Sequence, residues 1–182
     1  MANGYGKWRW WPIYTYNEKD ELLPEEVAAM NRLTQLPIKA LHLEAISVVT
    51  NLYRMSQGLK HKLEKDVLAV YGLSWSSFSI LYDLWIWDML ETKKLAETSG
   101  ISKATVSNVT KTLERKGFCY RQVDDKNKRT TYVVITENGR QVMEKLYPSF
   151  HQSEIDLVKS LSVEEQKMMS ELLRKLIKEN NF

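Results

Sequence analysis

The fold is decided by the stretch Thr92–Thr136, which reads TKKLAETSGISKATVSNVTKTLERKGFCYRQVDDKNKRTTYVVIT. Its first half predicts two short helices, over residues 93–99 and 102–116, joined by a turn that contains Gly100. Such a turn needs a residue that tolerates a positive φ, and glycine does so without a steric penalty. The arrangement of helix, turn and helix is typical of a DNA-binding motif.

Two further residues are in register with that turn. Ala96 is small at the point where the two helices would cross, and Val106 lies ten residues later, where a β-branched side chain can lock the second helix onto the first. The spacing of Ala96, Gly100 and Val106 matches a helix-turn-helix.

A helical wheel orients the second helix. At 100° per residue, Val106, Val109 and Leu113 share one face, with Ala104, Ser107 and Lys111 directly opposite and Lys103, Asn108 and Arg115 on the shoulders. A face of small, polar and basic side chains suits a major groove. An ordinary amphipathic surface helix is the alternative. The predicted DNA contacts on this helix are Ser102, which is also its expected N-cap, Lys103, Thr105, Ser107, Asn108 and Lys111.

The second half of the stretch predicts a β-hairpin with strands over residues 118–123 and 130–135. Its tip is basic, and a basic tip after a recognition-type helix forms a wing. Lys128 and Arg129 are the predicted DNA contacts there, because arginine suits a narrow, negative minor groove. The alternative is a solvated turn built by Asp124, Asp125 and Asn127.

Charge is concentrated in the same region. Residues 102–131 carry eight Lys and Arg against three Asp and Glu, whereas the chain as a whole has a formal net charge of +3. A concentrated basic segment indicates a polyanionic partner, although a solvated basic face would have the same composition.

Helices are expected on both sides of this core motif. Apolar residues at spacings of three and four predict one long helix over residues 38–70, roughly 50 Å in length, ended by Gly72. Ser74 caps a helix over 75–87. Another helix opens at Thr136, with an interruption near Pro148, and residues 162–165 form a capping box for the last one. Pro24 is expected at the first position of a short N-terminal helix.

Composition excludes several classes. One cysteine and three scattered histidines among 182 residues allow no intrachain disulfide and no metal centre. We therefore expect no cofactor, and without a paired acid/base or nucleophile we expect no enzyme. No apolar run is long enough to span a membrane, and the first residues lack the apolar core of a signal peptide, so we expect a cytoplasmic protein.

Aromatic residues raise two open questions. Trp8, Trp10 and Trp11 crowd the start of the chain, where they could cover the body or clasp a partner subunit. A second group could line a pocket for a small aromatic effector or belong to the core: Tyr53, Trp75, Tyr82, Trp85 and Trp87. Cys119 lies between Phe118 and Tyr120, which favours a packed thiol over a redox sensor.

From about Ile38 to Lys178 the sequence resembles the MarR family of winged helix-turn-helix transcriptional regulators. The residues that carry the resemblance are Leu95-Ala96, Gly100, Ser102-Lys103-Ala104-Thr105-Val106-Ser107, Leu113-Glu114-Arg115-Lys116-Gly117, Val134-Ile135-Thr136, Gly139 and Leu161-Ser162-Val163-Glu164-Glu165. The family's Asp-x-Arg wing motif falls on Asn127-Lys128-Arg129, so Arg129 matches the minor-groove arginine. Asn127 replaces the supporting aspartate, and Asp124 and Asp125 are the candidates to substitute for it.

The resemblance implies a mainly α fold, a winged helix-turn-helix with a small β-hairpin wing, whose N- and C-terminal helices form an intertwined dimerisation region. The overlong first helix and the apolar last helix agree with a homodimer. The expected organisation is an aromatic-rich N-terminal extension (1–37), a dimerisation helix (38–73), a winged helix-turn-helix DNA-binding lobe (74–136) and C-terminal dimerisation helices (137–182).

The expected function is a sequence-specific, DNA-binding transcriptional regulator, a repressor relieved by a small-molecule effector, which binds a pseudo-palindromic operator on double-stranded DNA as a homodimer. One alternative is a winged-helix protein–protein interaction module that does not read DNA specifically. The other, a small enzyme that uses the aromatic pocket, lacks a catalytic constellation.

Overall fold

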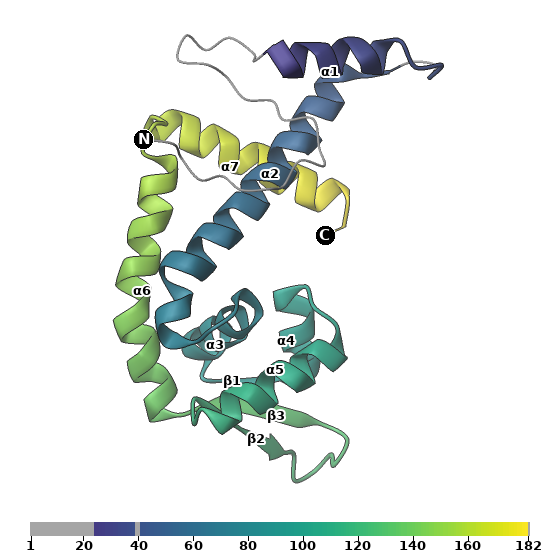
Figure 1. Ribbon diagram of the computed structural model, residues 1–182. Coiled ribbons are helices and arrows are strands. Elements are labelled where there is room, and N and C mark those ends of the chain that lie inside the picture. The colour runs from purple at the N-terminus through teal and green to yellow at the C-terminus, as the bar shows by residue number, and fades with distance from the viewer. Residues whose placement is uncertain (1–23, 39–40, 182) are drawn as a thin grey trace. The chain divides into compact units, whose positions relative to one another are not determined.

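The computed structural model describes residues 24–38 and 41–181 of the chain (Figure 1). The described residues divide into two compact units, one up to Leu59 and one from Lys60 onward, and the boundary falls within helix α2. The three tryptophans of the predicted N-terminal extension, Trp8, Trp10 and Trp11, lie outside the described residues.

Two helices precede the winged-helix elements. Helix α1 covers Pro24–Thr34, in agreement with the predicted short N-terminal helix. Helix α2 covers Leu43–Asp66 and is followed by a 3₁₀-helix, η1, Leu68–Tyr71. Gly72 then ends the segment with a φ of 60°.

The prediction of one unbroken helix over residues 38–70 was therefore wrong at both ends. The α-helical part has 24 residues, which corresponds to roughly 36 Å rather than 50 Å. Val67, at φ −120° and ψ −58°, departs from helical geometry, and the tighter turn after it buries Leu68 completely. Apolar spacing did not reveal the break, because turns of 3.0 and 3.6 residues place side chains on similar faces.

Helix α3, Trp75–Trp87, begins where its cap predicts. The Ser74 hydroxyl accepts a hydrogen bond from the Ser77 N–H at 3.2 Å. The Trp75 N–H, a second unpaired donor of the first turn, donates to Oε1 of Glu64 at 2.7 Å. This contact ties the start of α3 to the last turns of α2 inside the second unit.

The predicted helix-turn-helix is confirmed. Helix α4 covers Thr92–Ser99, Gly100 turns the chain at a φ of 64°, and helix α5 covers Lys103–Arg115. The hydroxyl of Thr98 on α4 donates to the Asp83 carboxylate on α3 at 2.6 Å. The motif is therefore held to α3 by a polar contact as well as by packing.

The hairpin is also confirmed, as part of a three-stranded antiparallel sheet in the order β1-β3-β2. Strands β2, Cys119–Val123, and β3, Thr131–Ile135, are the predicted pair. Strand β1, Met89–Glu91, was not predicted. It follows Asp88, which has a φ of 63° and turns the chain from α3 into the sheet while its side chain pairs with Arg140.

Two helices complete the chain, α6 over Glu137–Val158 and α7 over Val163–Glu179. The predicted interruption near Pro148 was wrong, because α6 runs through the proline without a break. Proline removes one helical hydrogen bond, but the buried side chains of Leu146 and Phe150 on either side anchor the helix. The predicted capping box of α7 is present between Ser162 and Glu165, and its hydrogen bonds lower the pKa of Glu165.

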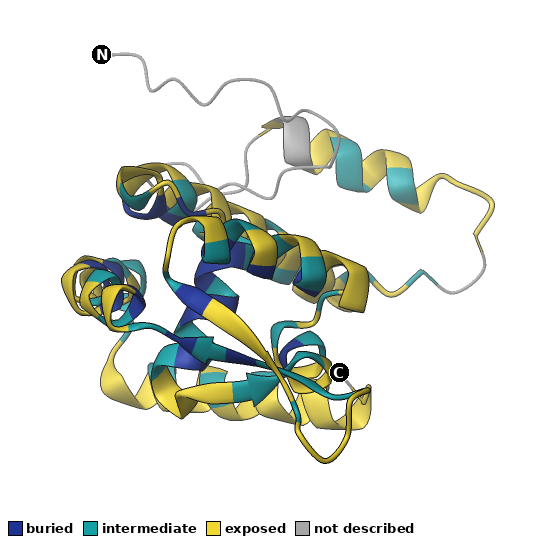
Figure 2. Ribbon diagram, turned by 90° about the horizontal axis from the view of Figure 1, so that it is seen from below, coloured by how far each residue is buried: buried dark blue, intermediate teal, exposed yellow. Residues whose placement is uncertain are grey.

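The core of the second unit surrounds α3, which contacts α4, α5, α6 and strands β1 and β3. Figure 2 shows the buried side of these elements facing inward and the hairpin tip fully exposed. The completely buried apolar side chains are Leu68, Ile80, Leu81, Leu84, Leu95, Val106, Leu113, Val133, Met143 and Leu146. This core fixes α5 and the hairpin relative to each other.

Candidate nucleic-acid interface

The buried face of α5 sets which side chains point outward. Val106, Thr110 and Leu113 are completely buried, whereas Val109, predicted on the inner face, is only half-buried. The Thr110 hydroxyl donates to the carbonyl oxygens of Val106 at 2.8 Å and Ser107 at 3.1 Å. Because its hydroxyl donor is satisfied within the helix, Thr110 can lie on the buried face, which the helical wheel had assigned to Val106, Val109 and Leu113.

Thr110 turns the wheel relative to the prediction. With the inner face centred on Val106, Thr110 and Leu113, the side chains directly opposite are Ala104, Asn108 and Arg115, and Lys111 lies about 45° to one side of them. Asn108 and Arg115 therefore move from the shoulders to the centre of the outer face. Ser107, predicted at the centre, is a half-buried shoulder residue.

The predicted contacts on α5 are otherwise exposed: Ser102, Lys103, Thr105, Asn108 and Lys111. Two of them serve the helix start as well. The Ser102 hydroxyl accepts from the Thr105 N–H at 3.1 Å and lies 2.8 Å from the Thr105 hydroxyl, so the predicted N-cap is confirmed. Lysines 103 and 111 lie on the exposed side, at the start and in the second half of the helix.

The wing turn is supported by Asp124. Its carboxylate accepts from the N–H groups of Lys126 at 2.8 Å and Asn127 at 2.6 Å. Backbone hydrogen bonds from Asp124 to Thr130 and from Thr130 to Asn127 close the loop. Of the two candidates for the missing aspartate, Asp124 holds the turn, and Asp125 pairs with the Lys128 ammonium at 3.4 Å.

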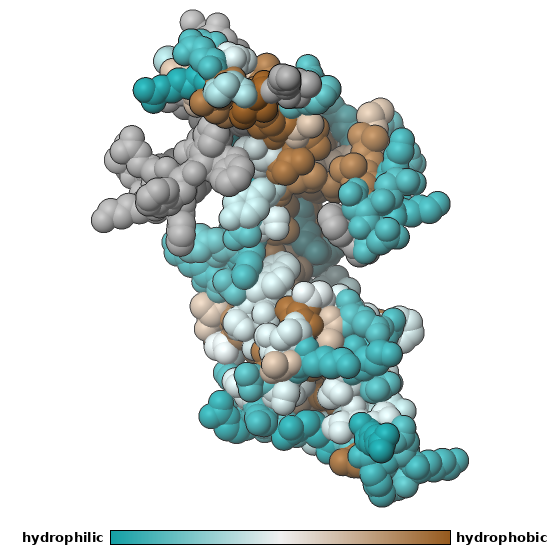
Figure 3. Space-filling model, turned by 90° about the vertical axis from the view of Figure 1, so that its right-hand side faces the viewer, coloured by the Kyte–Doolittle hydropathy of each residue, from teal (hydrophilic) through white to brown (hydrophobic). Residues whose placement is uncertain are grey.

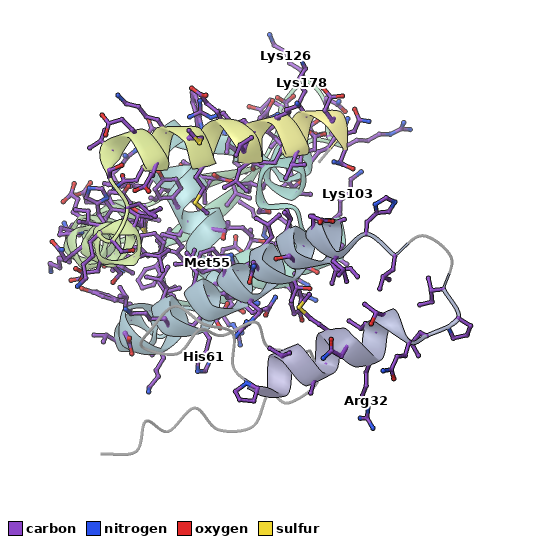
Figure 4. All side chains as sticks on the ribbon, turned by 90° about the horizontal axis from the view of Figure 1, so that it is seen from above. Arg32, Met55, His61, Lys103, Lys126 and Lys178 are labelled. Atoms are coloured by element: carbon purple, nitrogen blue, oxygen red, sulfur yellow. The ribbon has the colours of Figure 1, made fainter. Side chains whose placement is uncertain are left out.

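Arg129 keeps its guanidinium available at the wing. The side-chain oxygen of Asn127 accepts a hydrogen bond from the Arg129 backbone N–H at 3.2 Å. The asparagine therefore fixes the backbone of Arg129 without pairing with its guanidinium. Within the residues that the structure describes, no carboxylate pairs with Arg129. Lys126, at the tip, points away from the rest of the lobe (Figure 4).

A hollow lies beside the second half of α5. It is lined by polar and charged side chains only, namely Asn108, Lys111, Thr112, Glu114, Arg115 and Arg121. Figure 3 shows that the end of the molecule that carries the wing is predominantly hydrophilic. Arg115 and Arg121 were not among the predicted contacts. Arg115 would have followed from a wheel centred on Thr110, and Arg121 from the alternation of β2, which places it on the same side of the sheet as buried Cys119.

Cys119 is a packed thiol. Its side chain is buried between the sheet and α5, with the sulfur 3.9 Å from the Thr110 carbonyl oxygen. Burial, followed by the negative charge of Glu114, raises the pKa of Cys119 to about 12. A thiol that stays protonated is a poor nucleophile, which disfavours an oxidant-sensing role.

The aromatic residues of α3 form one cluster with α6. Phe78 stacks on Phe150 with ring centroids 4.2 Å apart, and Tyr147 contacts both Tyr82 at 5.7 Å and Trp85 at 5.2 Å. Loss of solvent and a hydrogen bond with Tyr82 raise the pKa of Tyr147. Trp75 belongs to the same cluster through Phe150.

Two members of the predicted pocket are not part of this cluster. Trp87, at the end of α3, is 66% exposed and stacks on no ring of the cluster, and Tyr53 belongs to the first unit, which is described by itself. In the described ranges, no group of three His, Cys, Asp or Glu residues could hold a metal ion. The described helices also include none long and apolar enough to cross a membrane.

The geometry of this lobe agrees with comparisons against known proteins. The protein-family model described as "MarR family" matches residues 73–131 of this chain. The HTH-type transcriptional regulator YwaE of Bacillus subtilis (strain 168) is 50% identical over 160 residues, which cover 88% of this chain and 94% of the relative.

Solved structures share the fold at low identity. Sco3205, a MarR family transcriptional regulator from Streptomyces coelicolor solved in complex with DNA, matches with a TM-score of 0.71 and 20% identity over 78% of this chain and 90% of its own. Bordetella bronchiseptica BpsR, whose DNA binding is regulated by 6-hydroxynicotinic acid, matches with a TM-score of 0.65 and 22% identity over 71% of this chain and 98% of its own. Given the confirmed helix-turn-helix and wing together with the YwaE similarity, this chain belongs to the MarR family of transcriptional regulators.

Proposed function

We propose that the protein regulates transcription by binding double-stranded DNA sequence-specifically. The observation that carries this proposal is the outer face of α5, where exposed polar and basic side chains stand opposite a completely buried face. An exposed helix of this composition fits the major groove, and the wing extends the same surface with Lys128 and Arg129. The DNA complex of Sco3205, which shares the fold, supports the assignment.

The proposed DNA-reading residues are Ser102, Lys103, Thr105, Ser107, Asn108 and Lys111 on α5, with Lys128 and Arg129 on the wing. Asn108 is the central residue among them because it lies at the middle of the outer face. Asparagine can bind adenine in a bidentate manner, so Asn108 is suited to read a base. Ser102 and Thr105 are better placed to contact phosphate near the helix start.

The working form is a homodimer on a pseudo-palindromic operator. Among the described residues, helix α7 buries none, and it exposes large apolar side chains, of which Met168, Leu172 and Leu176 form one row at helical spacing. A second copy related by two-fold symmetry would cover this row and present a second recognition helix. The proposed division of the chain is therefore a DNA-binding lobe at 74–136 between dimerisation segments at 38–73 and 137–182.

Regulation by a small aromatic effector is supported by the α3–α6 aromatic cluster. Tyr82, Trp85 and Tyr147 are each partly exposed, and their hydroxyl and ring groups could bind a phenolic acid. The regulation of BpsR by 6-hydroxynicotinic acid is a parallel within the same fold. We accordingly favour a repressor that the effector releases from DNA in the cytoplasm, with no catalytic step of its own.

The decisive experiment measures affinity for the promoter region of the protein's own gene against random duplex of equal length, at several salt concentrations. We expect tighter binding of the promoter by roughly a thousandfold or more, as is typical of specific regulators. Equal affinity for both duplexes would contradict specific regulation and favour the alternative of a winged-helix protein–protein interaction module. Release of the promoter by a hydroxybenzoate, lost in Tyr147→Ala, would test the effector separately.

The orientation of α5 has its own test. Lys111→Glu reverses a charge on the exposed outer face, so we expect promoter binding to be abolished while the oligomeric state is unchanged. Lys167→Glu on α7 is the matched control, because it makes the same charge reversal at an exposed position. Promoter binding by Lys111→Glu at wild-type affinity would mean that the helix presents a different face to DNA.

A further inference from the structure

The hollow beside α5 has the chemistry of an anion site. Its six lining residues include three cations, Lys111, Arg115 and Arg121, and one anion, Glu114. The other two, Asn108 and Thr112, can donate hydrogen bonds. Three cations against one anion give the hollow a positive charge, which suits an oxyanion.

Glu114 fixes Arg121 at the edge of this hollow. Its Oε2 atom lies 2.8 Å from a terminal guanidinium nitrogen of Arg121, and its Oε1 atom accepts the Arg121 backbone N–H at 2.9 Å. Both carboxylate oxygens are thus used by one residue, which connects α5 to strand β2. A guanidinium has five N–H donors, so donors remain for a second partner.

Arg121 is placed between the two elements expected to reach DNA. It lies on β2, which leads from α5 to the wing turn, and it pairs in register with Val133 on β3. A phosphate held at this position would set the depth and register of α5 without reading a base, as backbone contacts do. Because Glu114 already holds the arginine in place, little side-chain freedom would be lost on binding.

We propose that this hollow binds a backbone phosphate of the DNA, with Lys111, Arg115 and Arg121 as its ligands and Glu114 as the positioning residue of Arg121. The inference rests on the proposed function, since it assigns one subsite of the same interface. A guanidinium fork matches a phosphate oxygen pair, and three cations against one carboxylate leave the hollow positive.

The test begins with the full chain and the promoter duplex, titrated over a range of potassium chloride concentrations. Arg121→Gln should lower the slope of log affinity against log salt by about 1.8, because the dimer loses one phosphate contact in each half-site, and weaken specific and random duplex by the same factor. Arg121→Lys should keep the slope, because the charge remains. Lys167→Gln on α7, an exposed lysine in another helix, should change neither quantity.

A second measurement locates the phosphate. Duplexes with a single neutral methylphosphonate at successive positions should show one position per half-site where the wild-type protein loses roughly tenfold in affinity. Arg121→Gln should show no further loss at that position and the full loss at the others. Thermal unfolding of Arg121→Gln near the wild-type temperature would verify that the variant is folded.

The outcomes separate this inference from the function on which it rests. If wild-type protein does not prefer the promoter, the proposed function fails. If it does, and Arg121→Gln keeps the wild-type slope and methylphosphonate pattern, only the phosphate subsite is overturned. Inorganic phosphate at constant ionic strength should compete no better than chloride. Strong competition by phosphate that Arg121→Gln removes would overturn the backbone assignment in favour of a free phosphate ligand.

Discussion

The backbone of Arg129 is fixed by a hydrogen bond, and its guanidinium pairs with no carboxylate of the described residues. Asn127 accepts its backbone N–H, while the Lys128 ammonium beside it is paired with Asp125. We expect Arg129→Ala to weaken promoter binding by about 1–3 kcal/mol and to flatten the salt dependence, because a minor-groove cation is lost. Gel-shift titrations at several salt concentrations measure both quantities. Unchanged affinity and slope would remove Arg129 from the interface.

Cys119 yields a prediction about pH. Burial and the negative charge of Glu114 raise the pKa of Cys119 to about 12 in the folded chain, from an ordinary value of 9.0. Between these values the unfolded thiol loses its proton and the folded one keeps it, so this group contributes stability below pH 9 that is progressively lost up to pH 12. At pH 8 we expect iodoacetamide to alkylate Cys119 in denaturant and not in native protein, as mass spectrometry would detect.

Rapid alkylation of the native protein would contradict the burial of this thiol. Cys119→Ala provides a matched comparison for the pH effect, since it removes the titrating group while leaving Glu114 and Arg121 in place. The difference in stability between wild type and variant should shrink as the pH rises from 9 to 12.

At the scale of the elements, helix starts were predictable and long-range contacts were not. Ser74, Ser102, Thr136 and Ser162 each cap the helix that the sequence assigns to them, because a cap is a contact over three residues. Strand β1 depends on pairing with β3, more than 40 residues away in the chain. A three-residue strand has no periodicity of its own, so no local pattern revealed it.

In the candidate site too, features set by neighbouring residues could be predicted, and features set by contacts between elements could not. The exposed face of α5 could be assigned from its wheel, except where buried Thr110 shifted the centre toward Asn108 and Arg115. Thr110 was missed because its polarity is cancelled by hydrogen bonds to its own helix. Arg121 was missed because its role comes from Glu114, seven residues earlier on a different element.

The junction between the hairpin and α6 depends on Gly139. A β-carbon at this buried position would lie 2.2 Å from the carbonyl oxygen of Phe118 and 2.9 Å from Cγ1 of Ile135. Alanine normally favours a helix over glycine by up to about 1 kcal/mol, but here the collision is with backbone. We expect Gly139→Ala to lower the free energy of unfolding by about 1–3 kcal/mol in urea titrations.

Gly58→Ala is the matched control for Gly139→Ala. Gly58 is also inside a helix, α2, yet a β-carbon there would meet nothing within 4 Å. We expect this variant to raise the free energy of unfolding by roughly 0.5–1 kcal/mol through reduced backbone entropy. Destabilisation of both variants by similar amounts would mean that close packing at Phe118 is not the cause.

At the scale of the whole molecule, the exposed apolar side chains of α7 call for a partner. Met168 and Leu172 are 63% and 58% exposed, and they lie at helical spacing with Leu176. A single helix with so many exposed large apolar side chains is typical of an interface, because isolated chains keep such patches small. In a two-fold symmetric dimer, each of these side chains would be buried in both subunits.

Leu172→Lys tests this pairing. Burying one leucine is worth about 1.5–3 kcal/mol, and the substitution acts twice in a symmetric dimer, so we expect at least a hundredfold weaker self-association in sedimentation velocity. Glu171→Gln, at the adjacent exposed position, adds the same unit of charge and should leave the dimer intact. The positive charge of the added lysine cannot itself weaken binding to DNA. If Leu172→Lys loses promoter binding and Glu171→Gln does not, the loss therefore comes from the missing second recognition helix of the dimer. A Leu172→Lys protein that sediments as the wild type at every concentration would place the interface elsewhere.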